Sequence, residues 1–172
     1  VAAFERLIEL KPDHGAALNY LGYMYADRNE KLDRAYELVS RAVALEPSNA
    51  AYLDSLGWVC FRLGKVDEAE KHLLAAKRLS PDDPTIEEHL GDVAESRGDL
   101  AKAREHWTRA LALKPEDGGA ALKAKLEKSA AAAGGANEAP SLAAVPPDGF
   151  RPFQAPGKVV KVVKKDSLQA NQ

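Results

Sequence analysis

This 172-residue chain has a single cysteine, no long apolar run and nearly balanced charge. Its one cysteine, Cys60, excludes an internal disulfide, and the apolar run 58–61 around it favours a buried small residue over a reactive thiol. No apolar run approaches the roughly 20 residues that a membrane-spanning helix requires. The formal net charge of −2 gives no electrostatic case for nucleic-acid binding. We therefore expect neither a membrane span in this segment nor a nucleic-acid partner.

Catalytic and metal-binding motifs are also missing. The chain has no Gly-rich phosphate loop, no His-Glu-x-x-His and no Gly-x-Ser-x-Gly. Glu87 and Glu88 would point about 100° apart on a helix, so they cannot act on one bond. His72 and His106 would lie about 10 Å apart on packed helices, too far to share a metal, and are interpreted as surface histidines. We expect no catalytic residue, metal or cofactor here, so an enzyme would need a further domain upstream.

What the chain does contain is an internal repeat of 34 residues. A Leu-Gly pair recurs at spacings of 35 and 34 residues, and proline recurs at spacings of 35, 34 and 34. Alanines return in the same register. The markers are Leu21-Gly22, Leu56-Gly57 and Leu90-Gly91; Pro12, Pro47, Pro81 and Pro115; and Ala35, Ala69 and Ala103 with Ala42, Ala76 and Ala110. Independent markers with one period indicate a repeat array, and the extra residue of the first unit falls in the polar turn 27–31.

Each unit follows the pattern helix, turn, helix. Apolar residues recur at steps of three and four, glycine marks the turn within a unit, and proline ends the second helix. The pattern predicts helices near 2–11, 15–27, 31–46, 50–62, 66–79, 84–97, 100–113 and 118–132. The chain is therefore all-α.

The repeated small residues have a packing reason. Gly22, Gly57 and Gly91 lie within helices, where glycine costs about 1 kcal/mol relative to alanine. We expect the paired helix to approach closely at these points, with the small alanines facing them. Larger residues, namely Phe4, Leu73 and Trp107, would fill the space between successive hairpins.

The Leu-Gly, Ala, Ala, Pro pattern at this period resembles the tetratricopeptide repeat over roughly residues 1–115. The resemblance implies a right-handed superhelical solenoid of stacked hairpins that binds another protein or peptide. We divide the chain into a solenoid, 1–132, and a low-complexity linker with a basic tail, 133–172. The solenoid comprises a half repeat, 1–14, the repeats 15–49, 50–83 and 84–117, and a solvating cap helix, 118–132.

Three runs narrow the resemblance: 17–23 (Ala-Leu-Asn-Tyr-Leu-Gly-Tyr), 53–59 (Leu-Asp-Ser-Leu-Gly-Trp-Val) and 89–93 (His-Leu-Gly-Asp-Val). They resemble the C-terminal repeats of envelope lipoproteins and adaptors of Gram-negative bacteria. This implies a periplasmic parent protein, anchored in the outer membrane through a lipid site upstream of Val1. A cytoplasmic location is the alternative.

In such an array the first helix of each hairpin lines a concave surface. Helical spacing assigns to this groove Asn19, Tyr20, Tyr23 and Asp27, then Asp54, Ser55, Trp58 and Arg62, then Glu88, His89, Asp92 and Glu95. Large aromatic side chains of this kind are enriched at binding hot spots. Asn19, Asp54 and Ser55 would contact a peptide backbone, and the acidic third unit would favour a basic segment. Alternatively, Trp58 and the tyrosines partly fill the seam between packed helices, and the acidic residues form a solvated face.

The groove lacks the cations with which tetratricopeptide co-chaperones grip a terminal carboxylate. The matching places hold Asn19, Tyr23, Ser55, Thr85 and His89, so a chaperone-tail clamp is not expected. The tail from Ala133 carries five Lys or Arg against three Asp or Glu. It is either a disordered C-terminus or a segment that docks on a partner or on the acidic groove.

Two functional classes follow. The first is a scaffold or adaptor that binds a polypeptide in the concave groove, within a bacterial envelope complex. The second is an assembly segment without a separable ligand, in which the repeats stack on another copy or within a larger complex. An exposed apolar end at 1–10 would favour this second class, although truncation of a longer chain would by itself expose such an end.

Overall fold

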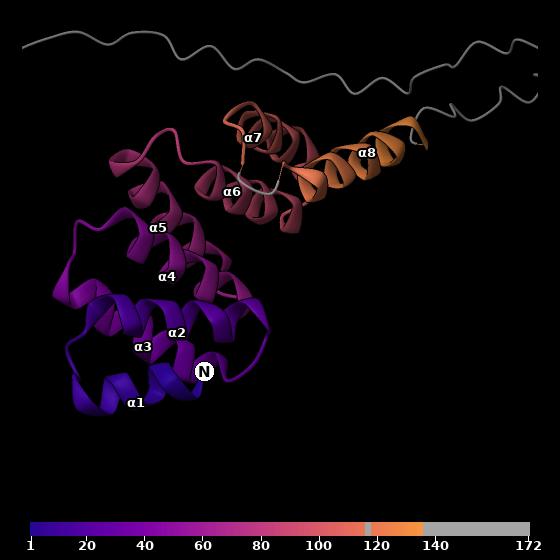
Figure 1. Ribbon diagram of the computed structural model, residues 1–172. Coiled ribbons are helices and arrows are strands. Elements are labelled where there is room, and N and C mark those ends of the chain that lie inside the picture. The colour runs from indigo at the N-terminus through magenta and orange to yellow at the C-terminus, as the bar shows by residue number, and fades with distance from the viewer. Residues whose placement is uncertain (116–117, 136–172) are drawn as a thin grey trace, which may run out of the picture. The chain divides into compact units, whose positions relative to one another are not determined.

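Eight α-helices and no strand make up the part of the chain that the computed structural model describes, residues 1–115 and 118–135 (Figure 1). They are α1 (Ala2–Leu10), α2 (Gly15–Asp27), α3 (Leu32–Leu45), α4 (Ala50–Arg62), α5 (Val66–Leu79), α6 (Pro84–Ser96), α7 (Leu100–Ala112) and α8 (Ala120–Gly135). The predicted bounds of α1 to α7 hold to within one residue. The last helix begins later and runs further into the alanine-rich stretch than predicted. Our expectations for the tail beyond it lie outside the described residues.

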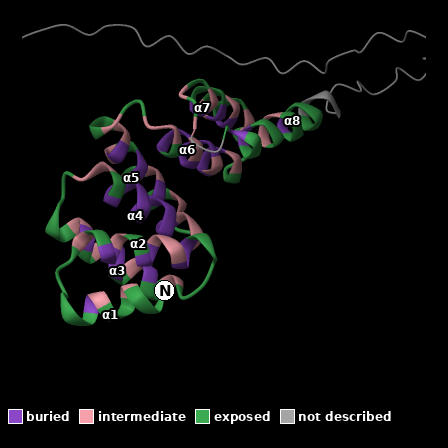
Figure 2. Cartoon of the chain, in the orientation of Figure 1, coloured by how far each residue is buried: buried purple, intermediate pink, exposed green. Residues whose placement is uncertain are grey.

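The helices pack as consecutive hairpins. α2 pairs with α3, α4 with α5, and α6 with α7, while α3 and α5 also contact the next hairpin and α8 packs on α7 (Figure 1). α4 is flanked on both sides, and it is buried continuously from Tyr52 to Cys60. Figure 2 shows the buried positions gathered where helices meet.

Cys60 is buried, as predicted, and burial raises the pKa of its thiol to about 11.

Turn chemistry fixes the helix ends. Asn49 and Asp83 follow the repeat prolines, and their side-chain oxygens accept hydrogen bonds from the backbone N–H of Tyr52 (3.3 Å) and of Thr85 (2.9 Å). Gly64 takes a positive φ of 76° in the turn between α4 and α5. The longer first unit has no glycine at its turn and uses Asn29 and Lys31 at positive φ instead.

The predicted close approach at the mid-helix glycines is confirmed. A Cβ on Gly22 would lie 2.5 Å from Val39 Cγ2, and one on Gly57 would lie 2.7 Å from Leu73 Cγ. Leu73 and Trp107 are fully buried as expected. Phe4 is only half-buried, and its ring packs against that of Tyr20 with the ring centroids 4.5 Å apart.

Gly57→Ala tests this packing. Helix propensity alone would stabilise the variant by about 1 kcal/mol. The added methyl would meet Leu73 and, at 3.1 Å, the backbone oxygen of Ala69, and overpacking of this kind costs about 1–3 kcal/mol. We expect urea unfolding to show a net loss of up to about 2 kcal/mol, the overpacking cost less the propensity gain. The exposed position Ala51 in the same helix supplies the control, since Ala51→Gly reports propensity alone. A gain in stability for Gly57→Ala would contradict the packing.

Candidate binding groove

Side chains of α2, α4, α6 and α8 line a groove of about 610 Å³. Six of its residues were assigned to the groove from the sequence, namely Tyr23, Asp27, Trp58, Glu88, His89 and Asp92. The others are Asp83, Pro84, Thr85, Pro115, Ala121 and Lys125. Helical spacing therefore identified half of the lining, and the remainder comes from helix ends and from α8.

Aromatic rings form one part of the lining. The Trp58 and His89 rings stack with centroids 4.3 Å apart and planes 13° from parallel, and the Tyr23 ring lies 6.5 Å from His89. The Arg62 guanidinium sits 5.5 Å above the Trp58 ring. Trp58 is only 9% exposed, so it belongs to the packed seam and also borders the groove. Its indole N–H finds no acceptor within the described chain.

Tyr23 supplies a polar group beside these rings. Its side chain is half-buried, and burial together with the charges of Asp27, Asp54 and Glu88 raises its pKa to about 12. The phenol therefore keeps its proton at neutral pH and remains able to donate a hydrogen bond.

The His89 ring of this stack also makes a buried polar contact with Asp54. His89 Nδ1 is 2.9 Å from Asp54 Oδ1, which joins α6 to α4 across neighbouring repeats. Burial by itself lowers the pKa of His89, but the charge and hydrogen bond of Asp54, with the charges of Asp92 and Glu88, raise it above its usual value. Asp54 and Ser55 are 7% and 4% exposed. The expectation that they face a bound backbone is therefore corrected, because α4 and α6 contact each other at this point.

The other residues assigned from the sequence are not part of the lining of this groove. Tyr20 is half-exposed and packs on Phe4 of α1. Asn19 is partly buried, and its Oδ1 atom has no partner among the described residues. Arg62 reaches the groove only through its contact with Trp58.

Lys125 of α8 closes the acidic end of the groove, and sequence reasoning missed it. Its Nζ lies 2.7 Å from Glu88 Oε1 and 2.6 and 2.8 Å from the two carboxylate oxygens of Asp92. Burial lowers the pKa of Lys125, but these hydrogen bonds outweigh it and the pKa is raised. A signal was present, because Lys125 follows the buried Leu122 by three residues and so shares its face of the helix. The solvating cap thus also contributes a wall of the groove.

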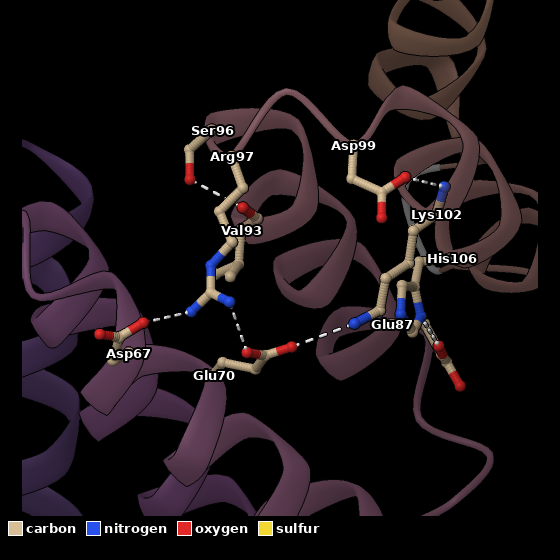
Figure 3. A network of polar contacts seen from close by, with 9 residues as sticks. All are labelled: Asp67, Glu70, Glu87, Val93, Ser96, Arg97, Asp99, Lys102 and His106. Atoms are coloured by element: carbon tan, nitrogen blue, oxygen red, sulfur yellow. Dashed lines mark hydrogen bonds and ion pairs between the residues drawn. The ribbon is translucent and has the colours of Figure 1, made fainter. Parts of the chain in front are cut away.

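A second polar network joins α5, α6 and α7. The buried Glu87 carboxylate contacts Lys77 Nζ (2.8 Å), His106 Nδ1 (2.7 Å) and Arg109 Nε (2.8 Å). Figure 3 shows the contact between Glu87 and His106 beside a chain of ion pairs from Asp67 through Arg97 and Glu70 to Lys102. The interpretation of His106 as a surface histidine is therefore wrong, since its side chain is mostly buried and paired.

Within residues 1–115 and 118–135, no three His, Cys, Asp or Glu side chains are placed to hold a metal ion. No helix in these ranges is both long and apolar enough to cross a bilayer.

Comparison with known proteins identifies the array. Residues 1–50 and 24–84 match the family model described as tetratricopeptide repeat. The stacked hairpins are thus those of a tetratricopeptide-repeat solenoid, a fold that in general mediates protein–protein interaction. Over 67 residues the chain is 45% identical to a TPR repeat-containing protein of Pseudomonas aeruginosa. That match covers 39% of this chain but only 11% of the relative.

Solved structures share the fold at low sequence identity. The Sgt2 TPR domain from Aspergillus fumigatus aligns with a TM-score of 0.65 at 20% identity, over 80% of this chain and 90% of that domain. The first TPR of Spaghetti (RPAP3), bound to the HSP90 peptide SRMEEVD, aligns with a TM-score of 0.60 at 22% identity, over 70% and 93%. The first TPR domain of human RPAP3 aligns with a TM-score of 0.62 at 22% identity, over 72% and 95%.

Proposed function

We propose that this chain is a scaffold or adaptor that binds a polypeptide segment in the groove between α2, α4, α6 and α8. The observation that carries the proposal is the groove itself, where the packed aromatic side chains Tyr23 and Trp58 lie next to ionised residues. Such a surface offers apolar contact area together with hydrogen-bond donors and acceptors. The peptide-bound structure of Spaghetti (RPAP3) supports a polypeptide as the kind of ligand.

The ligand proposed here differs in charge from the HSP90 peptide SRMEEVD that Spaghetti (RPAP3) holds. The lining of this groove carries Asp27, Asp83, Glu88 and Asp92, while its one lysine, Lys125, is already paired with two of them. An acidic peptide would meet like charge there. We therefore infer that the partner segment is neutral or basic.

For the cellular setting we propose a periplasmic envelope complex, with a parent protein anchored in the outer membrane. The three runs 17–23, 53–59 and 89–93 support this, together with the similarity to the Pseudomonas aeruginosa repeat protein. A cytoplasmic parent remains the alternative. Fractionation of cells that make the full-length tagged parent would distinguish the two, because a cytoplasmic tag would remain in spheroplasts after outer-membrane release.

An assembly segment, including self-association, is the second candidate function. α1 favours it, because Leu10 at the end of this helix is 65% exposed. Leu10→Glu should then dissociate a complex that the groove variants described next leave intact.

Removing the aromatic side chains tests the adaptor proposal. A polypeptide partner that co-purifies with the wild-type chain should be lost from Tyr23→Ala/Trp58→Ala, with helicity retained in circular dichroism. Because Trp58 is buried, Thr85→Trp provides an independent variant that fills the groove from an exposed position. Tyr20→Ala is the matched control, since Tyr20 does not line the groove. Retained binding in both groove variants would overturn the proposal.

A further inference from the structure

We propose that Glu88 and Asp92 form a specific site for a lysine side chain of the bound polypeptide, which Lys125 of α8 occupies in competition with the ligand. This inference rests on the proposed function of the groove and adds the chemistry of its partner. The two carboxylates stand one helical turn apart on α6 and border the same groove as Tyr23 and Trp58.

The geometry of the site fits a primary ammonium. Lys125 Nζ makes three contacts, of 2.6, 2.7 and 2.8 Å, to three carboxylate oxygens. An ammonium has three N–H donors, so this arrangement satisfies each of them. The site is also held in shape, because the Trp107 indole N–H donates to Asp92 Oδ1 at 3.0 Å. Trp107 is fully buried, which keeps Asp92 oriented whether or not Lys125 is in place.

The charge of the groove lining favours a basic ligand. Four of the lining residues are Asp or Glu, and Lys125 is the one Lys or Arg in the lining. When Lys125 leaves the site, Glu88 and Asp92 lose their cation in a partly enclosed groove. A ligand lysine restores the same contacts, so the exchange replaces one ammonium by another with little electrostatic cost.

Other contacts allow α8 to stay docked while Lys125 moves away. Leu122 of α8 is buried against α7, and Arg104 of α7 donates to the Ser129 hydroxyl at 3.0 Å and to the Ser129 carbonyl. Trp58 is nine-tenths buried and borders the same groove, and its buried indole N–H has no acceptor in the described chain.

Lys125→Met tests whether Lys125 competes with the ligand for this site or instead supports ligand binding. The methionine keeps the apolar stem and removes the ammonium. If Lys125 occupies the site about nine-tenths of the time, its removal makes a lysine ligand bind roughly tenfold more tightly. Lys125→Arg retains a cation and should bind close to the wild-type level. Glu88→Gln/Asp92→Asn should weaken the same ligand at least tenfold.

The probe is a displayed library of random dodecapeptides, sorted on the complete 172-residue chain. Selected peptides are then synthesised with their lysine intact or replaced by norleucine, and Kd is measured by fluorescence anisotropy. The proposal expects lysine-enriched peptides, tighter binding to Lys125→Met, and weaker binding of the norleucine analogues. Peptides that bind in the groove without dependence on lysine, or that bind Lys125→Met no better than wild type, would overturn this inference alone. Failure to select any groove-binding peptide would overturn the proposed function together with it.

Discussion

Glu87→Ala is expected to lower the free energy of unfolding by about 3 kcal/mol, the low end of the range for breaking a buried ion pair. The Glu87 carboxylate is buried and contacts Lys77, His106 and Arg109, so its loss leaves three groups of α5 and α7 without their anion. The Lys77 and Arg109 side chains are 27% and 50% exposed. They can regain water after the substitution, which is why the expected cost lies at the low end.

Urea unfolding at pH 7 measures this effect. Glu105→Ala, an exposed position in α7, provides the control and should stay within about 0.5 kcal/mol of wild type. Burial alone would raise the pKa of Glu87, but hydrogen bonds from Lys77 and His106 lower it below its usual value of 4.5. The stabilisation is therefore present above pH 4.5 and is lost as the pH falls through the lower folded pKa. Equal stabilities of Glu87→Ala and Glu105→Ala would contradict the role of this network.

Asp54→Ala should destabilise the protein by about 2–3 kcal/mol near pH 6.5, because it leaves the buried His89 without its partner. The cost should shrink at higher pH. Asp54, helped by Asp92 and Glu88, raises the pKa of His89 above 6.5 despite burial, so the folded protein holds this proton more tightly than the unfolded chain. The associated stability is complete below pH 6.5 and is lost as the pH rises through the folded pKa.

Unfolding of wild type, Asp54→Asn and His89→Gln between pH 6.5 and 9 tests this linkage. Burial lowers the pKa of His72, so its contribution makes stability rise with pH until about its usual value of 6.5. The range therefore begins at pH 6.5, where this opposite trend has ended. Wild-type stability should fall with pH across this window, whereas both variants should show a flatter profile. A wild-type profile as flat as that of His89→Gln would contradict the ion pair.

The sequence predicted the helices and their packing seam closely, and the reason lies in the repeat. The contact between Gly57 and Leu73 lies at positions of a repeat whose Leu-Gly pair occurs three times. The repeat period therefore predicts both where the helices begin and end and where paired helices approach closely. The groove was harder to predict. Asp54 and His89 both fall on the concave face by helical spacing, yet they lie buried because side chains of neighbouring repeats meet across α4 and α6. The spacing of residues along the sequence does not give the distance between side chains of neighbouring repeats.

Lys125 illustrates the same limit. The alanine- and lysine-rich composition of α8 is typical of a solvated helix, and the repeat register has faded at this point. Its role depends on where α8 packs on α7 and on two carboxylates more than 30 residues earlier in the chain. Only the tertiary arrangement brings these three side chains together.

An NMR titration of the full chain with a selected library peptide tests the central claim most directly. The protein has two tryptophans, so their indole N–H signals report separately on the aromatic lining and on the acidic site. We predict that the Trp58 signal and the backbone signals of Tyr23, Thr85 and Asp92 shift together, with the Trp107 signal following as Lys125 leaves. Saturable shifts confined to α1, α3 or α5, with both indole signals unmoved, would contradict the assignment of this groove as the polypeptide-binding site.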